Sequence, residues 1–89
     1  MADQNSTDRS TATGEQRQLL ADNVRRFRLE KGWSQKKLAR HAQIDRTHLA
    51  RLESRAINVS LDIIICLATA LNIDIRELFT PREEWPDSD

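Results

Sequence analysis

The sequence has almost no cysteine, glycine or proline. Its one cysteine, Cys66, excludes an internal disulfide and favours a reducing compartment. Its two glycines form no Gly-rich loop of the kind that cradles a phosphate. No apolar run approaches the roughly 18 residues of a membrane span, and residues 1–14 lack the apolar centre of a signal peptide. We therefore expect a cytoplasmic protein that does not enter a membrane.

Residues that could carry catalysis are also few. The candidates are His41, His48, Cys66 and scattered carboxylates, and they form no nucleophile–base pair. The two histidines have no cysteine or carboxylate partner at a metal-ligand spacing. We therefore expect no enzyme, no metal and no cofactor, and nothing in the pattern indicates a small-molecule ligand.

The formal net charge is zero, but the charges are unevenly distributed. Between Arg25 and Arg55, ten bases stand against three acids, a local charge of +7. From Thr80 to Asp89, one base stands against four acids, a local charge of −3. A basic segment beside an acidic tail is typical of a phosphate-binding surface. An ordinary solvated helix surface has the same composition, so the charge leaves both interpretations open.

Hydrophobic periodicity predicts five helices between two polar ends. Residues 1–14 are small and polar and are expected to be a disordered leader, and residues 80–89 an acidic tail. An apolar stripe predicts a first helix over about 15–31, ended by a left-handed Gly32. Four more helices, at about 35–42, 46–54, 61–71 and 75–79, follow four capping side chains: Ser34, Asp45, Ser60 and Asp74.

Residues 34–54 contain the most specific pattern. Two short helices, each opened by a capping residue and joined by a short turn, describe a helix-turn-helix. In the second helix, Leu49 and Leu52 are predicted to face inward. The residues predicted to face outward are Arg46, Thr47, His48, Arg51 and Arg55. Both helices are too short to be stable alone, so packing against the rest of residues 15–79 must hold them.

The predicted helix at 61–71 is more apolar than a small monomer needs. Its inward face is expected to contain Leu61, Ile64, Ala68 and Leu71. Further apolar side chains extend around it: Ile63, Ile65, Cys66 and Leu67. An exposed patch of this kind usually marks an interface, so these four residues predict a symmetric homodimer formed through this helix and the short helix at 75–79. The alternative is that the C-terminal tail, with Trp85, covers some of them.

From Val24 to Phe79 the sequence resembles the Cro-repressor-like (XRE) helix-turn-helix family. The matching segments are VRRFR, KGWSQKKLA, IDRTHLARLE and SLDIIICLATALNIDIRELF. The resemblance implies an all-α, compact five-helix domain of the lambda-repressor type with flexible termini, whose third helix lies in the major groove of double-stranded DNA. Within the family, the D-R-T run and the loop before Ser60 look most like controller proteins of restriction–modification systems.

The resemblance also implies roles for individual residues. Arg28 and Glu53 match a partly buried ion pair that ties the first helix to the third. The positions that match DNA contacts are Gln35, Lys36, Arg46, Thr47, His48, Arg51, Ser54, Arg55 and Asn58. Among these, Arg46, Thr47 and Arg51 match the groove-facing positions, while His48 matches a backbone contact or a spectator.

Together these features predict a sequence-specific transcriptional regulator that binds a palindromic operator as a homodimer. The alternative is an antitoxin-like or other protein-interaction module with the same fold, which would use the apolar helix but would not require a basic recognition helix. The sequence departs from the family at Gln43 and Arg55, where glycine is common, and at Val59, where proline is common. A left-handed Gln43 would cost about 1 kcal/mol.

Overall fold

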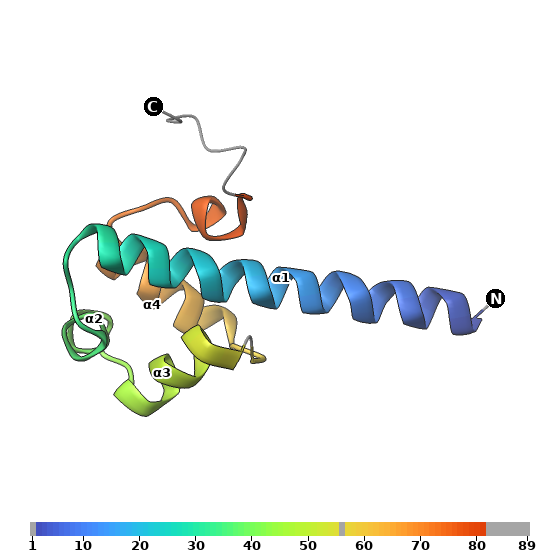
Figure 1. The fold of residues 1–89 in the computed structure, drawn as a ribbon, viewed down its shortest axis with the longest axis horizontal. Coiled ribbons are helices and arrows are strands. Elements are labelled where there is room, and N and C mark those ends of the chain that lie inside the picture. The colour runs from blue at the N-terminus through green and yellow to red at the C-terminus, as the bar shows by residue number, and fades with distance from the viewer. Residues whose placement is uncertain (1, 56, 82–89) are drawn as a thin grey trace.

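The computed structural model describes residues 2–55 and 57–81, with side chains from Ala12 onward except that of Arg55. The described chain folds into four α-helices and one 3-10 helix: α1 (Ala2–Glu30), α2 (Gln35–Ala42), α3 (Arg46–Arg55), α4 (Leu61–Leu71) and η1 (Ile75–Phe79) (Figure 1). No strand occurs within these residues. The all-α prediction is confirmed, but the fifth helix is a 3-10 helix of five residues and not an α-helix.

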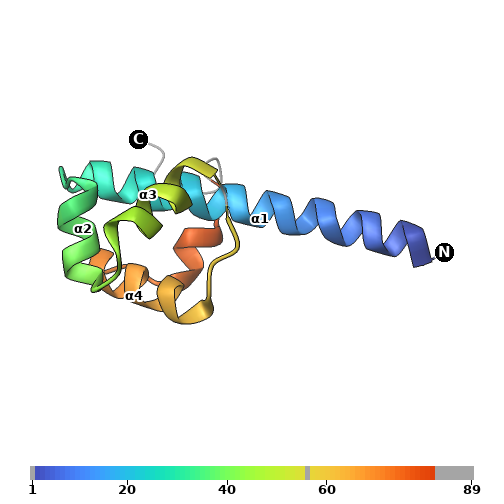
Figure 2. The same cartoon turned by 90° about the horizontal axis from the view of Figure 1, so that it is seen from below.

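The first helix is much longer than predicted. It begins at Ala2, so residues 2–14, expected to be disordered, continue α1 and project beyond the packed domain (Figures 1 and 2). This segment has no apolar stripe, so periodicity gave no reason to expect a helix there. Adding turns to a helix already fixed by packing requires no new nucleation, which favours the extension. The predicted acidic tail beyond Pro81 lies outside the described residues.

Capping side chains set the beginnings of the next three helices, as predicted. Ser34, Asp45 and Ser60 each accept a hydrogen bond from the backbone N–H three residues ahead, at 3.0, 3.1 and 3.2 Å respectively. These bonds satisfy donors that have no partner inside the helix. The observed α2 and α4 therefore have the predicted bounds, and α3 is one residue longer.

Three helices end in the same left-handed turn. Gly32, Gln43 and Asn72 have φ angles of 71°, 58° and 59°. In each case the next residue donates its N–H to the carbonyl five residues back, at 3.0–3.1 Å. Those next residues are partly buried apolar side chains: Trp33, Ile44 and Ile73. This Schellman geometry turns the chain sharply and returns it to the core, as predicted for Gly32.

The core collects apolar side chains from α1, α2, α3, α4 and η1. Its fully buried members include Val24, Leu38, Leu49, Leu67, Leu71 and Leu78. Helix α1 lies along α3, α4 and η1, and α2 packs against α3 and α4 (Figure 2). Because α2 and α3 are both held by α4 or α1, the short helix-turn-helix is fixed by its surroundings, as the sequence predicted.

A buried amide, which the sequence analysis missed, attaches η1 to α1. Asn23 is 2% exposed, and its Nδ2 donates to the carbonyl oxygens of Leu78 and Thr80, both at 3.0 Å, and of Glu77 at 3.4 Å. These carbonyls lie at or just after the last turn of a helix, where the helix itself offers few N–H donors, and Asn23 supplies one. Asn23 therefore fixes the point at which the chain leaves the domain.

Helix η1 begins at the predicted cap, Asp74, which forms a capping box with Glu77. Asp74 accepts from the Arg76 N–H at 2.8 Å, and Glu77 accepts from the Asp74 N–H at 2.9 Å. The Arg76 guanidinium also donates to Asp74 at 2.9 Å, and this bond lowers the pKa of the Asp74 carboxyl from 3.8 to about 2.

Within the described part of the chain, no helix is long and apolar enough to cross a membrane.

Candidate nucleic-acid interface

Helix α3 has one face in the core and one face in solvent. Leu49, Leu52 and Glu53 are buried. The exposed residues are Arg46, Thr47, Arg51 and Ser54, and His48 is half-buried. The inward and outward positions predicted for α3 are therefore confirmed, except that His48, predicted to face outward, is half-buried. The backbone of Arg55 ends α3, but its side chain is outside the described residues.

The turn between α2 and α3 is short and tightly fixed. Gln43 adopts the left-handed conformation and donates its N–H to the Arg40 carbonyl at 3.2 Å. Ile44 follows it and packs partly buried against the core, and Asp45 then caps α3. The exposed face of α3 is therefore held in a defined orientation to the N-terminus of α2.

The predicted ion pair between Arg28 and Glu53 is present and joins α1 to α3. The Arg28 Nε and Nη2 atoms donate to the two Glu53 carboxylate oxygens at 2.8 and 2.9 Å. Arg28 Nη1 donates to the Trp33 carbonyl at 2.7 Å. The side chains of Arg28 and Glu53 are only 10% and 3% exposed, so both charges depend on these partners.

Gln35 belongs to the same network, which the sequence did not predict. Its Nε2 donates to Glu53 Oε1 at 3.0 Å. A glutamine amide has two N–H donors, so the bond to Glu53 orients the side chain and leaves a second donor. Gln35 is the first residue of α2 and half-buried, next to the exposed Lys36. This geometry suits contact with an anion at the helix N-terminus.

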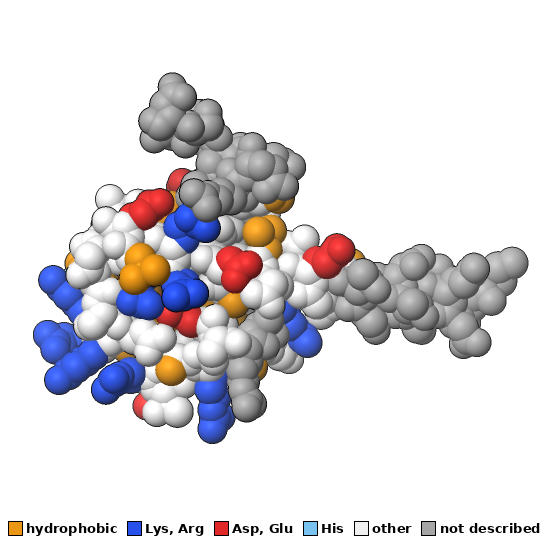
Figure 3. Space-filling view, in the orientation of Figure 1, with side chains coloured by type: hydrophobic (Ala, Val, Ile, Leu, Met, Phe, Trp, Pro, Cys, Tyr) orange, Lys and Arg blue, Asp and Glu red, His pale blue; other side chains and the backbone are white. Residues whose placement is uncertain are grey.

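Basic side chains gather at the end of the molecule formed by α2. Figure 3 shows lysine and arginine side chains along this edge, at its left, and the exposed bases of α2 include Lys36, Lys37 and Arg40. Trp33 stacks on His41 with ring centroids 4.5 Å apart. The Nζ atom of Lys37 lies 5.4 Å from the centre of the Trp33 ring, a cation–π contact.

The loop between α3 and α4 places one more predicted residue at the surface. Asn58 is exposed, while Ile57 and Val59 on either side are half-buried and pack against the core. The apolar contact of Val59 anchors the loop where the family commonly has proline. The loop thus presents a single amide between two anchored residues.

Helix α4 divides its apolar residues between the core and the surface. Leu67 was predicted at a dimer interface, and this is wrong, because its side chain is fully buried and forms one stripe with Ala68 and Leu71. Leu61 was predicted to face inward but is 64% exposed in the first turn of α4. Ile65 is 46% exposed, and Ile63 and Cys66, a free thiol, are half-buried.

Among the residues that the structure describes, no group of three His, Cys, Asp or Glu side chains is placed to hold a metal ion. The arrangement that remains is a basic, rigidly held face on α3 beside the N-terminus of α2. A family model described as "Helix-turn-helix" matches residues 24–78, from the last two turns of α1 to η1. The chain is an XRE-type helix-turn-helix protein.

Relatives of this XRE-type protein have regulatory names. A "Neisseria hypothetical transcription factor" from Neisseria meningitidis is 41% identical over 68 residues, covering 76% of this chain and 64% of its own length. "Control protein C.SmaI" from Serratia marcescens is 38% identical over 64 residues, covering 72% of this chain and 76% of that protein. This chain thus spans just under two thirds of the Neisseria relative.

A solved structure extends the same comparison to the fold. The restriction-modification controller protein C.AhdI from Aeromonas hydrophila superimposes with a TM-score of 0.67 at 41% sequence identity. The match covers 71% of this chain and 96% of that one. The resemblance to controller proteins, first suggested by the D-R-T run of α3, therefore holds in both sequence and structure.

Proposed function

We propose that this XRE-type protein is a sequence-specific DNA-binding transcriptional regulator that acts in the cytoplasm as a homodimer on a palindromic operator. One observation carries the proposal. The exposed face of α3 presents Arg46, Thr47 and Arg51, while the opposite face is fixed in the core and by the Arg28–Glu53 pair. A rigid helix with an outward basic face is the form in which this fold enters the major groove.

The exposed residues of α3 have the chemistry to read base edges. Arg46 and Arg51 can each donate two parallel hydrogen bonds to guanine O6 and N7, and the Thr47 methyl can contact a thymine methyl. Each bidentate contact contributes about 1–3 kcal/mol of discrimination against a wrong base. These three side chains are therefore the proposed base readers.

The surrounding residues are proposed to bind phosphates and so set the position of α3. Gln35, oriented by Glu53, and Lys36 lie at the N-terminus of α2, where the helix dipole also favours an anion. Ser54 and Asn58 are exposed beyond the readers. His48, half-buried, and Arg55, on sequence grounds alone, complete the proposed set. Such contacts fix orientation and carry no sequence information directly.

The proposed dimer forms through the exposed part of α4. Leu61 and Ile65 lie four residues apart on one face of the helix and are both largely exposed, with Ile63 and Cys66 beside them. A two-fold axis through this surface would relate two copies of α3. They would then enter successive major grooves about 34 Å apart, which requires a palindromic site.

The test compares Arg46→Ala with Arg40→Ala, which changes another exposed arginine, on α2, that is not among the proposed contacts. Mobility shifts use DNA from upstream of the protein's own gene, with scrambled competitor. We expect Arg46→Ala to weaken binding to the cognate site about 5- to 150-fold, the equivalent of 1–3 kcal/mol. Binding to scrambled DNA should fall much less, and Arg40→Ala should leave the preference for the cognate site unchanged.

Two results would contradict the proposal. Equal losses on cognate and scrambled DNA would make Arg46 a phosphate contact only. Affinity should also fall steeply as salt rises, because phosphate contacts release counterions. A flat response to salt would exclude DNA as the ligand and favour the alternative, a protein-interaction module that uses the exposed Leu61 and Ile65.

A further inference from the structure

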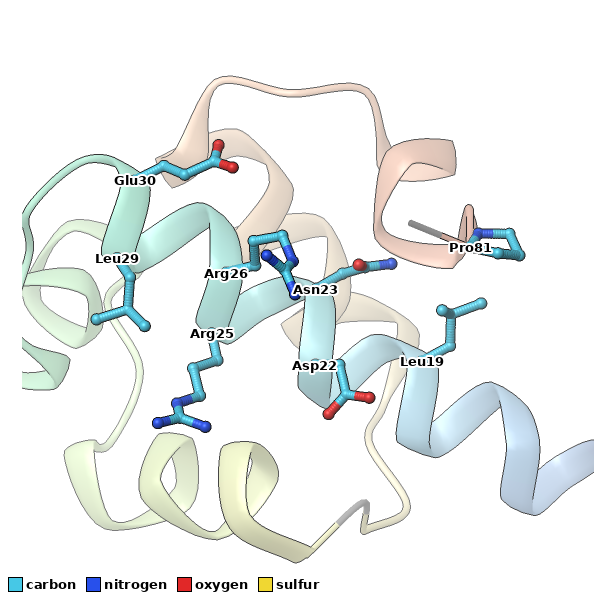
Figure 4. Close-up of a pocket in the computed structure, with 8 residues that line it drawn as sticks. All are labelled: Leu19, Asp22, Asn23, Arg25, Arg26, Leu29, Glu30 and Pro81. Atoms are coloured by element: carbon cyan, nitrogen blue, oxygen red, sulfur yellow. The ribbon is translucent and has the colours of Figure 1, made fainter. Parts of the chain in front are cut away.

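The outer face of α1 carries a surface hollow of about 640 Å³ (Figure 4). Its lining combines apolar and charged side chains from successive turns of α1: Leu19, Asp22, Arg25, Arg26, Leu29 and Glu30. Leu29, in the last turn of α1, is a leucine that is 54% exposed. An exposed leucine beside two arginines is a surface that suits an apolar and acidic segment.

The described part of the chain ends at one end of this hollow. Pro81 lines the hollow at its Leu19 end, as Figure 4 shows. The three hydrogen bonds from Asn23 hold the backbone just before Pro81 against α1. Whatever follows Pro81 therefore starts at a fixed point on the rim of the hollow.

The eight residues after Pro81 are chemically complementary to the hollow. They carry one aromatic side chain, Trp85, and four acids against a single base, Arg82. We propose that residues 82–89 dock in this hollow and run along α1 from Asp22 toward Leu29. Arg82 faces Asp22, the acids Glu83 and Glu84 face the two arginines, and Trp85 covers Leu29.

The spacings along the two segments agree. Seven residues of α-helix, from Asp22 to Leu29, span about 10 Å at 1.5 Å per residue. Three residues of extended chain, from Arg82 to Trp85, span about 10 Å as well. Pro86 favours the extended conformation at Trp85, because it disfavours helix in the residue before it. The charges and the tryptophan of the tail can therefore lie opposite their proposed partners on α1 in the same order. Pro81 sets the direction in which the tail would run.

Two acids on α1 set the limits of the docked segment. Asp22 already accepts a hydrogen bond from Gln18 at 2.9 Å, and Glu30 stands at the far end of the hollow. Glu30 would repel Asp87 if the tail continued straight along α1. The bend expected at Pro86 instead directs Asp87 and Asp89 away. The docked part is therefore residues 82–86, with Trp85 as its anchor.

The experiment uses the full chain labelled with ¹⁵N and ¹³C. The two indole N–H signals in the NMR spectrum are assigned with Trp85→Phe. We expect nuclear Overhauser contacts between the Trp85 indole and the Leu29 methyl groups. We also expect the Trp85 indole N–H to exchange with solvent about tenfold more slowly than in a free peptide of residues 82–89, for a tail that is docked nine-tenths of the time.

Substitutions in the hollow test the register. Leu29→Ser and the double variant Arg25→Glu/Arg26→Glu should both return Trp85 exchange to the peptide rate. The matched control, Lys36→Glu/Arg40→Glu, reverses two charges on α2 and should leave the protection intact. The quadruple variant that combines Arg25→Glu/Arg26→Glu with Glu83→Arg/Glu84→Arg should restore the protection of the Trp85 indole N–H. Amide spectra would verify that each variant is folded, and Leu29→Ser alone tests docking if charge reversal unfolds α1.

Three results would overturn the proposal. The first is a Trp85 that exchanges at the peptide rate in the unaltered chain. The second is protection that survives Leu29→Ser and the reversed arginines, which would place Trp85 elsewhere. The third is protection that disappears on dilution, which would assign the hollow to the tail of a second copy. None of these results bears on DNA binding, which is measured separately.

Discussion

Gln43 holds a backbone conformation that glycine would adopt more easily. Its φ of 58° strains a side chain with a Cβ atom, yet the turn into α3 requires it. Gln43→Gly should raise the free energy of unfolding by about 0.5–1 kcal/mol, after the added freedom of glycine in the unfolded chain is subtracted. Urea denaturation would measure it. Asn72→Gly should gain less, because asparagine tolerates this conformation, and a less stable Gln43→Gly would refute the strain.

The buried pair of Arg28 and Glu53 predicts an unequal response to single and double substitution. Arg28→Met leaves a 3%-exposed carboxylate without its guanidinium and should cost roughly 3–5 kcal/mol. Arg28→Met/Glu53→Leu should cost less than this single change, because no buried charge remains. Arg76→Ala, in an exposed pair, serves as the control and should change stability much less than either buried-pair variant. Additive losses in urea denaturation would contradict this account.

For single residues, the sequence predicted where a side chain lies better than it predicted which partner the side chain bonds to. The Arg28–Glu53 pair followed from the family resemblance, and the caps from local spacing, which needs no tertiary information. Gln35 was expected to contact phosphate, but its bond to Glu53 depends on how α2 meets α3. Asn23 was overlooked although it lies on the apolar stripe of α1 with Leu20 and Phe27, and a polar residue on such a stripe indicates a buried hydrogen bond.

At the scale of elements, η1 depends on one amide from α1. Asn23→Asp keeps the shape of the side chain but replaces the donating nitrogen with an oxygen that repels three carbonyls. We expect a loss of about 1–3 kcal/mol, together with faster hydrogen exchange throughout η1. Asn72→Asp makes the same chemical change at an exposed position and should leave η1 exchange unaltered. Equal exchange rates in both variants would show that apolar packing alone holds η1.

The sequence predicted the first and last residues of a helix well where a capping residue sets the end. It predicted them poorly where the spacing of apolar residues was the only signal. Helix α2 lies between Ser34 and Gln43 as expected, since both of its ends are set by local hydrogen bonds. The N-terminal half of α1 was missed because its helicity continues a packed helix and leaves no apolar pattern. The misassigned Leu67 arose because α4 is apolar around its middle, so that periodicity alone could not fix which residue completes the core.

At the scale of the whole molecule, the exposed isoleucine of α4 determines the proposed assembly. Ile65→Asp should produce a monomer by sedimentation and abolish tight operator binding, because a desolvated carboxylate would oppose an apolar interface. Leu29→Asp introduces the same charge at a comparably exposed position on α1 and should leave the mass unchanged. An Ile65→Asp protein whose mass equals that of the parent would remove α4 from the interface.

The shape of α1 has a consequence for how the molecule moves in solution. Helix α1 has 29 residues and is about 43 Å long at 1.5 Å per residue. It runs along the longest axis of a molecule whose extents are 46, 33 and 19 Å. Rotation about this long axis meets less friction than rotation of the molecule end over end. Backbone N–H vectors in α1 lie along this axis. They should therefore show longer effective rotational correlation times in NMR relaxation than the N–H vectors in α2, whose axis is not parallel to that of α1.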